Sequence, residues 1–217
     1  MKNRESLYVL DEFLIKHSEL IDQKENILSV YESIRDAFLN GNSLYICGNG
    51  GSAADALHIV GELMKSFTIE RPICDEVKKS IEALFPEDSD FLEGNLQGAL
   101  PAYALHNSTS IETAFNNDVC ADMVYAQQIY GYGKAGDVLL GISTTGNSKN
   151  IVNAVKVAKA KKIHTIVLTG YDGGKLKKLC NTAIIVPKHK VFEVQELHLP
   201  IYHLLCIMWE YYFFKKV

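Results

Sequence analysis

The sequence lacks the features that define several protein classes. Its longest apolar stretches, 163–168 and 201–208, fall well short of the about 20 residues that a membrane-spanning helix needs. The first residues, MKNRESLYVLDEF, contain no apolar core of a secretory signal. Basic residues form no long run, and the net charge is −4. We therefore expect neither a membrane nor a nucleic acid as a partner.

Cysteine is scarce and unpaired. The five cysteines stand at positions 47, 74, 120, 180 and 206, and none forms a CxxC pair. Disulfide frameworks use an even number of cysteines, and zinc knuckles contain a CxxC pair. This pattern favours reduced thiols and predicts a cytoplasmic protein.

The length of 217 residues fits one globular domain, and 47% hydrophobic residues are typical of a folded chain. In the first 41 residues, apolar side chains recur at steps of three and four, which predicts helix. A break at 18–24 divides this segment into two helices, and Gly41-Asn42 ends it.

From residue 42 the pattern changes to short apolar runs that alternate with glycine loops and helical stretches. The expected strands are 43–47, 102–105, 137–142, 164–168 and 182–186. The expected helices are 52–67, 119–131, one ending near 161, a short one after the TGYDGG loop, and 194–213. This alternation predicts an α/β fold, a three-layer αβα sandwich with a five-stranded parallel sheet.

The segment 74–99 differs in composition from its neighbours. It is charged, and we expect one short helix that ends before Pro86. It is too short to hold a core of its own. We interpret it as a surface insertion that enters near the ligand-binding edge of the sheet.

The first glycine loop follows the strand at 43–47 and contains Asn49, Gly50, Gly51 and Ser52. Glycine lets the backbone approach a ligand closely, and the helix behind it offers unpaired N–H groups to an anion. The alternative is a plain tight turn in which Ser52 is the N-cap.

The second loop, between the strand at 137–142 and its helix, gathers hydroxyl groups around Gly146. They belong to Ser143, Thr144, Thr145 and Ser148. Hydroxyls and backbone N–H groups together bind phosphate without a lysine. Neither loop matches GxGxxG or GxxxxGK[ST], so we expect a phosphorylated small molecule at the carboxyl edge of the sheet.

Two helices carry side chains suited to proton or metal chemistry. His58 and Glu62 are four residues apart and share one helix face. Gln195 and His203 lie on the apolar terminal helix, about 12 Å apart along a straight axis. A kink at Pro200, or contributions from different subunits, would bring them together. The alternative is that His58–Glu62 is a buried polar pair and His203 a hydrogen-bonded core residue.

Several segments together resemble the sugar isomerase (SIS) domain family, and most of all its phosphoheptose isomerases. They are CGNGGSAAD, the His58/Glu62 helix, Asn117-Asp118 within TAFNND, GDVLLGISTTGNSKN and the terminal VQELH helix. The resemblance covers 42–217 apart from the insertion at 74–99.

The resemblance implies isomerisation of sedoheptulose 7-phosphate to D-glycero-D-manno-heptose 7-phosphate through an enediolate, with Glu62 and His203 as the acid–base pair. It implies substrate binding by Asn49, Gly50, Gly51, Ser52, Glu62, Asn117, Asp118, Ser143, Thr144, Thr145, Ser148 and Gln195. It implies one Zn²⁺ per subunit, held by His58, Glu62, Gln195 and His203.

The same resemblance implies a homotetramer with sites at subunit interfaces, in which residues 1–41 pack the subunits together. The chain departs from the family pattern at Lys65-Ser66, where an arginine is usual, and at Phe192, where an acidic residue is common. Two alternatives stay open. One is an isomerase of another ketose phosphate, and the other is a non-catalytic tetramer that binds a phosphosugar or a protein.

Overall fold

A parallel sheet of five strands forms the centre of the molecule, in a computed structural model that describes residues 2–215. The strand order is β2-β1-β3-β4-β5, and every neighbouring pair is parallel. The strands are β1 (Leu44–Gly48), β2 (Ala102–Ala104), β3 (Val138–Ser143), β4 (His164–Thr169) and β5 (Thr182–Ile185). The predicted sheet is confirmed.

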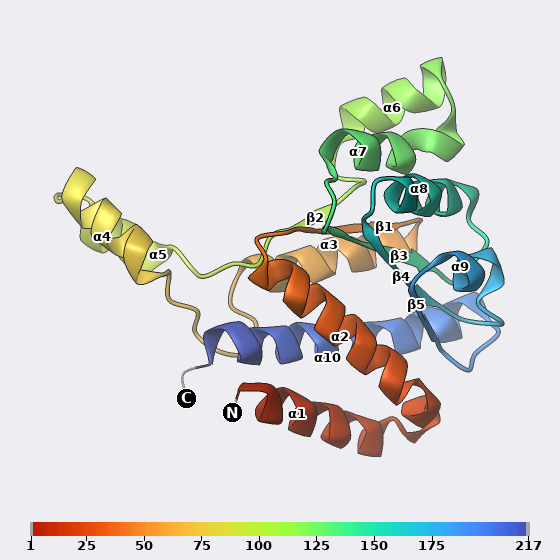
Figure 1. The fold of residues 1–217 in the computed structure, drawn as a ribbon, viewed down its shortest axis with the longest axis horizontal. Coiled ribbons are helices and arrows are strands. Elements are labelled where there is room, and N and C mark those ends of the chain that lie inside the picture. The colour runs from red at the N-terminus through yellow and green to blue at the C-terminus, as the bar shows by residue number, and fades with distance from the viewer. Residues whose placement is uncertain (1, 216–217) are drawn as a thin grey trace.

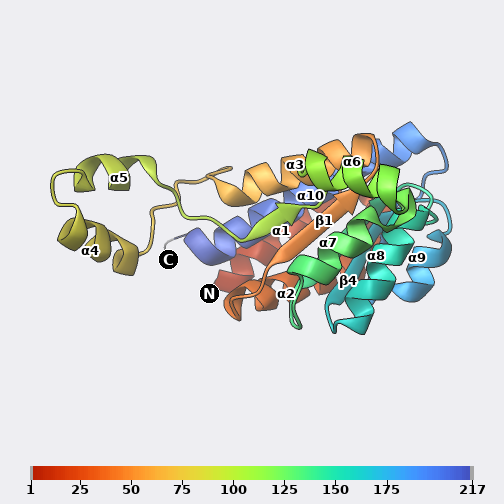
Figure 2. The same cartoon turned by 90° about the horizontal axis from the view of Figure 1, so that it is seen from above.

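Helices cover both faces of the sheet (Figures 1 and 2). One face carries α2 (Lys24–Leu39), α3 (Gly51–Met64) and α10 (Val191–Phe214), with α1 (Lys2–Lys16) against α10. The other carries α7 (Val124–Tyr132), α8 (Lys149–Ala160) and α9 (Gly174–Leu179). Residues of β1 alternate between the two cores: Leu44 and Ile46 enter the first, Tyr45 and Cys47 the second. The three-layer prediction is therefore correct.

The N-terminal helices belong to the same core as the sheet. Leu10, Leu20 and Ile27 are completely buried there, and Ser6 Oγ donates a hydrogen bond to the carbonyl of Met208 in α10. A 3₁₀ segment, Ser18–Gln23, separates α1 from α2 at the predicted break. These helices thus pack on their own chain, and their role in packing subunits stays a prediction.

The insertion forms a helical arm that projects from the body (Figure 2). It contains two helices, α4 (Asp75–Leu84) and α5 (Ser89–Asn95), where one was expected; no residue described in either is buried. Its predicted position is also wrong. The arm leads directly into β2, so it stands at the amino ends of the strands, whereas the glycine loops follow the carboxyl ends.

Helix α6 (Thr109–Asp118) was not expected, and the helix predicted over 119–131 begins only at Val124, after a 3₁₀ turn at Ala121–Met123. None of the described residues of α6 is buried, and its apolar side chains are few; of these, Phe115 packs on the second core while only partly buried. Helix α3 ends at Met64, three residues earlier than predicted. Within residues 2–215 no helix is both long enough and apolar enough to cross a membrane.

Candidate active site

The two glycine loops meet at the carboxyl edge of the sheet. Asn49 in the first loop and Asn150 at the start of α8 exchange side-chain hydrogen bonds of 3.0 and 2.8 Å. Tyr125 Oη, from α7, donates to the carbonyl of Gly48 at 2.6 Å. These bonds hold the first loop beside the second, as the predicted shared anion site requires.

In the second loop, the hydroxyls of Ser143 and Ser148 lie 2.9 Å apart. Gly146 has a φ of +66°, and a Cβ there would lie 2.0 Å from the carbonyl oxygen of Gly173. No other residue fits this turn, because the loop packs directly on the backbone after β4. Thr144 and Thr145 are half-buried, and α8 begins immediately behind Ser148. Hydroxyls therefore cluster at a helix N-terminus, which is suited to an anion.

Gln195 lies against the first loop. A Cβ on Gly51 would lie 2.5 Å from Nε2 of Gln195, so a side chain at this position would displace the amide. Asn49 and Gly50 are exposed beside it, and Ser52 is buried. The residue before α3 is Gly50, so Ser52 is not the N-cap that the alternative interpretation required. The structure thus places an amide side chain, within one chain, at the loop expected to bind substrate.

Helices α3 and α10 run side by side (Figure 1) and bring three more of the expected residues together. Nε2 of His58 lies 3.1 Å from Oε1 of Glu62. The rings of His58 and His203 meet edge to face, with 4.9 Å between their centroids. His203 Nε2 is buried and has no hydrogen-bond partner among the described residues. This nitrogen thus lacks the partner that the alternative interpretation, a hydrogen-bonded core histidine, would give it.

Burial sets the proton affinity of His203. It lowers the pKa of the imidazole, and the neighbouring His58 lowers it further, while Glu62 acts in the opposite direction. The net shift is downward from 6.5, so the ring is neutral at neutral pH. A neutral imidazole beside a carboxylate is able to accept a proton.

Two residues that the sequence analysis did not select join this cluster. Tyr202 Oη donates to Oδ1 of Asp55 at 3.2 Å and lies 3.1 Å from Nδ1 of His58. Burial raises the pKa of Asp55, opposed by the Tyr202 hydrogen bond and by His58. A signal was available: Asp55 precedes His58 by three residues on α3, so both lie on one helix face.

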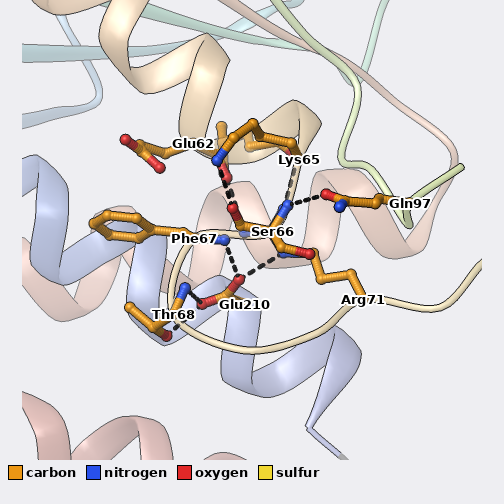
Figure 3. Close-up of polar contacts among 9 residues, drawn as sticks. Glu62, Lys65, Ser66, Phe67, Thr68, Arg71, Gln97 and Glu210 are labelled. Carbon is orange, nitrogen blue, oxygen red and sulfur yellow. Dashed lines mark hydrogen bonds and ion pairs between the residues drawn. The ribbon is translucent and has the colours of Figure 1, made fainter. Parts of the chain in front are cut away.

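A buried ion pair fixes the end of α3, next to Glu62 (Figure 3). Arg71 Nη2 donates to the carbonyl of Glu62 at 2.8 Å, and Arg71 Nε donates to Glu210 at 2.7 Å. Glu210 also accepts hydrogen bonds from the backbone N–H groups of Phe67 and Thr68, 2.8 Å each. These bonds take the backbone groups that would have continued the helix, which explains why α3 ends at Met64.

Asn117 and Asp118 occupy the last turn of α6. Both are exposed, and Nδ2 of Asn117 donates to Oδ1 of Asp118 at 2.7 Å. They belong to the α6–α7 layer, on the opposite face of the sheet from α3 and α10 (Figure 1). Their contact with a sugar stays a prediction.

The donor types of the expected zinc site are suitable, since zinc takes histidine and carboxylate ligands. His58, Glu62 and His203 are adjacent, and Nε2 of His203 is free of partners among the described residues. Gln195, however, lies about two helical turns away, beside Gly51. Among residues 2–215, no group of three His, Cys, Asp or Glu side chains is arranged to hold a metal. One chain alone therefore does not complete the four-ligand set.

Sequence comparison finds a SIS domain over residues 13–95 and 94–170. The phosphoheptose isomerase of a Nitratiruptor species is 37% identical over 199 residues, which cover 87% of this chain and 92% of that protein. The phosphoheptose isomerase of Maridesulfovibrio salexigens is 34% identical over 214 residues, which cover 99% of this chain and 89% of that protein.

Structure comparison finds the same group of proteins. A phosphoheptose isomerase from Neisseria gonorrhoeae superimposes with a TM-score of 0.70 and 32% identity, over 95% of this chain and 94% of the other. One from Francisella tularensis gives a TM-score of 0.71 with 25% identity, over 95% and 93%. Both the sequence and the fold of this chain are thus similar to those enzymes along nearly its whole length.

Proposed function

Because this chain belongs to the SIS-domain family, alongside the phosphoheptose isomerases that it resembles, we propose that it is an aldose–ketose isomerase that interconverts sedoheptulose 7-phosphate and D-glycero-D-manno-heptose 7-phosphate. The observation that carries this proposal is the meeting of Glu62 and His203 around His58, from two different helices. A binding protein has no chemical need for a carboxylate and a neutral imidazole at one point.

The reaction moves a carbonyl between two adjacent carbons. A base removes a proton from one carbon to give an enediolate, and an acid returns a proton to the other. In the proposed scheme the Glu62 carboxylate and the His203 imidazole share these two transfers. The lowered pKa of His203 keeps its ring neutral and able to accept a proton.

The glycine loops supply binding energy at the other end of the substrate. Ser143, Thr144, Thr145 and Ser148 surround the phosphate in this proposal, at the N-terminus of α8. Gln195 and the first loop then face the sugar. Because the loops lie at the sheet edge and the acid–base pair lies along α3, an extended sugar phosphate fits this arrangement better than a short one.

Purified protein incubated with sedoheptulose 7-phosphate and followed by NMR tests the proposal directly. We expect the aldose product from the wild type and at least a 100-fold loss of turnover in Glu62→Gln and in His203→Gln, in line with the size of general acid–base effects, roughly 10²–10⁴. His189→Gln serves as a control. Turnover that both site variants leave unchanged would exclude the acid–base assignment.

The substrate alternative is decided by the same assay with a panel of other ketose phosphates. Calorimetric titration decides the non-catalytic alternative. A sugar phosphate that binds the wild type but is never converted, under any metal condition, would identify a binding protein instead of an enzyme.

We also propose that the site binds one zinc ion through His58, Glu62 and His203 of one chain and Gln195 of a neighbouring subunit, since Gln195 of the same chain lies beside Gly51. The unpartnered Nε2 of His203 and the neighbouring donors support this, and zinc would supply Lewis-acid stabilisation of an enediolate oxygen. Elemental analysis and zinc titration of metal-stripped protein test it. We expect one zinc per chain, and at least tenfold weaker binding in His203→Gln.

A homotetramer in the cytoplasm is the assembly and location we propose. Exposed Leu57 and Met64 on α3 and exposed Leu199 on α10 support subunit contacts close to the site, and five free cysteines suit a reducing compartment. Light scattering after size-exclusion chromatography tests the assembly: a monomeric mass would contradict it. Fractionation of the source cells tests the location.

A further inference from the structure

The hydroxyl of Tyr202 connects two side chains of α3. Tyr202 lies on α10 and is 2% exposed. Its oxygen is 3.2 Å from Oδ1 of Asp55 and 3.1 Å from Nδ1 of His58. The rings of Tyr202 and His58 also meet edge to face, 5.5 Å between centroids. A continuous path of polar contacts therefore runs from Asp55 through Tyr202 and His58 to Glu62.

The hydroxyl has one proton to donate, so its two contacts must differ. Oδ2 of Asp55 is buried without a hydrogen-bond partner among the described residues, so the Asp55 carboxylate depends on the Tyr202 hydroxyl. A carboxylate can only accept hydrogen bonds, and a hydrogen bond to a charged acceptor is stronger than one to a neutral acceptor. The Tyr202 proton thus goes to Asp55, and the Tyr202 oxygen is left to accept a hydrogen bond from N–H at Nδ1 of His58.

This direction of hydrogen bonding distinguishes the two ring nitrogens of His58. Nδ1 is committed as a donor toward Tyr202. Nε2 is the nitrogen left to face Glu62, 3.1 Å from Oε1. Because Nδ1 is already a donor, this contact is a hydrogen bond only when the ring or the carboxyl group carries one further proton. A carboxylate that orients a histidine from behind is a common arrangement in enzyme sites, and here a tyrosine stands between the two.

We propose that Asp55 and Tyr202 are positioning residues of the isomerase, which hold the His58 ring with Nδ1 as donor and Nε2 toward Glu62. The kinetic test of this proposal rests on the isomerase activity proposed above. Neither residue reaches the reacting atoms, because each acts through His58. Tyr202 is adjacent to His203 in sequence. The same turn of α10 therefore supplies one proposed acid–base residue, His203, and the hydroxyl that positions His58.

The kinetic test uses Tyr202→Phe, Asp55→Asn and the double variant. We expect each single change to lower kcat about 10–100-fold, the usual range for residues that orient a functional histidine, with KM within about twofold of wild type. Because Asp55 acts through Tyr202, the double variant should be no slower than Tyr202→Phe alone. Effects that multiply in the double variant would overturn the shared path.

Tyr45→Phe is the matched control. Tyr45 is a buried tyrosine of β1 whose hydroxyl donates one hydrogen bond, 3.3 Å, to the carbonyl of Tyr132. The Tyr45→Phe change likewise removes a tyrosine hydroxyl oxygen, but at a distance from the site. We therefore expect the kcat of the wild type. Equal losses of kcat in Tyr45→Phe and Tyr202→Phe, in step with their melting temperatures, would reduce Tyr202 to a structural role.

A spectroscopic test is independent of the substrate. In metal-free protein labelled with ¹⁵N-histidine, we expect the wild-type His58 signal, identified by its loss in His58→Gln, to show a protonated Nδ1. Tyr202→Phe should abolish that preference. An unprotonated Nδ1 in the wild type would overturn the proposal even if the enzyme is active. A protonated Nδ1 in a protein without turnover would instead refute the proposed function and leave the positioning intact.

Discussion

His58 and His203 come from different helices, yet their rings meet edge to face with 4.9 Å between centroids. The contact requires α3 and α10 to run side by side, and both helices are fixed by the core they share under the sheet. The first loop is tied to the same pair of helices, because Gln195 of α10 lies over Gly51 of α3. The geometry of the site thus follows from how two helices pack, and the two glycine loops contribute the end that we propose binds the substrate.

The hydroxyl pair in the second loop predicts how phosphate is recognised. Ser143 and Ser148 lie 2.9 Å apart, each with capacity to donate to an anion. Removing one donor to a charged group costs about 1.5–3 kcal/mol, so Ser148→Ala should raise KM at least tenfold with a smaller change in kcat. Steady-state kinetics measure this. Unphosphorylated sedoheptulose is the comparison, and an equal loss with that sugar would show that Ser148 does not contact phosphate.

The buried ion pair at the end of α3 predicts a large loss of stability when it is broken. Arg71 and Glu210 are completely buried and 2.7 Å apart. Burial raises the pKa of Glu210, but hydrogen bonds from Thr68, Phe67 and Arg71 outweigh it, so the pKa lies below its ordinary value. Glu210→Ala leaves the guanidinium charge unpaired and should lower the free energy of unfolding by about 3–5 kcal/mol.

Urea denaturation measures this loss. Glu193→Ala is the control, because Glu193 pairs with Lys190 at 3.2 Å on the surface, where ion pairs contribute about 0–1 kcal/mol. Similar losses in the two variants would mean that the buried pair contributes no more to stability than a surface pair.

The positions of the strands along the chain and the two glycine loops were predictable because their signals are local. A short apolar run followed by GNGGS or STTGNS is sufficient to place a strand, a turn and a helix start. The position of the arm was not predictable in this way. Its exit depends on Glu210, far along the chain, which accepts the N–H groups of Phe67 and Thr68 and ends α3.

The same limit applies to the site. His58 and Glu62 share a helix face by spacing alone, which the sequence shows. Their approach to His203, and the contact of Tyr202 with Asp55, depend on the packing of α10 against α3. A tyrosine in an apolar helix has no periodic signal that separates a core residue from one that supports a histidine.

Buried His198 predicts a pH dependence of stability. It is completely buried in α10, and burial lowers its pKa from 6.5 to about 4. The unfolded chain therefore binds a proton at this residue more tightly than the folded chain does. The free energy of unfolding falls as the pH drops below 6.5 toward 4. From about pH 7.5 to about pH 5 the loss from this residue is about 2 kcal/mol.

Replacing His198 by leucine removes this proton. Over the same pH range, we expect the free energy of unfolding to fall by about 2 kcal/mol less in His198→Leu than in the wild type. Urea denaturation at the two pH values measures this difference. His189→Leu should follow the wild type. Identical pH slopes in wild type and His198→Leu would mean that the folded protein accommodates a charged ring at this position.

The arm predicts that a large deletion is tolerated. None of the described residues of α4 or α5 is buried, and the base of the arm is closed by a 2.7 Å hydrogen bond from the N–H of Gly98 to the carbonyl of Arg71. Replacing residues 74–96 by a short Gly-Ser linker removes no core side chain and lengthens no loop. We therefore expect a folded protein by circular dichroism, with a melting temperature within about 4 °C of wild type, equivalent to about 1 kcal/mol or less.

The contrasting variant lacks residues 1–16, a shorter deletion than that of the arm. Helix α1 supplies Leu10 and Leu14 to the main core, and burying such a side chain contributes about 1.5–3 kcal/mol. We expect this truncation to destabilise the protein far more than loss of the arm. If the arm deletion costs as much, its exposed apolar residues, such as Leu84 and Phe91, must be covered by another subunit, because nothing within the described chain buries them.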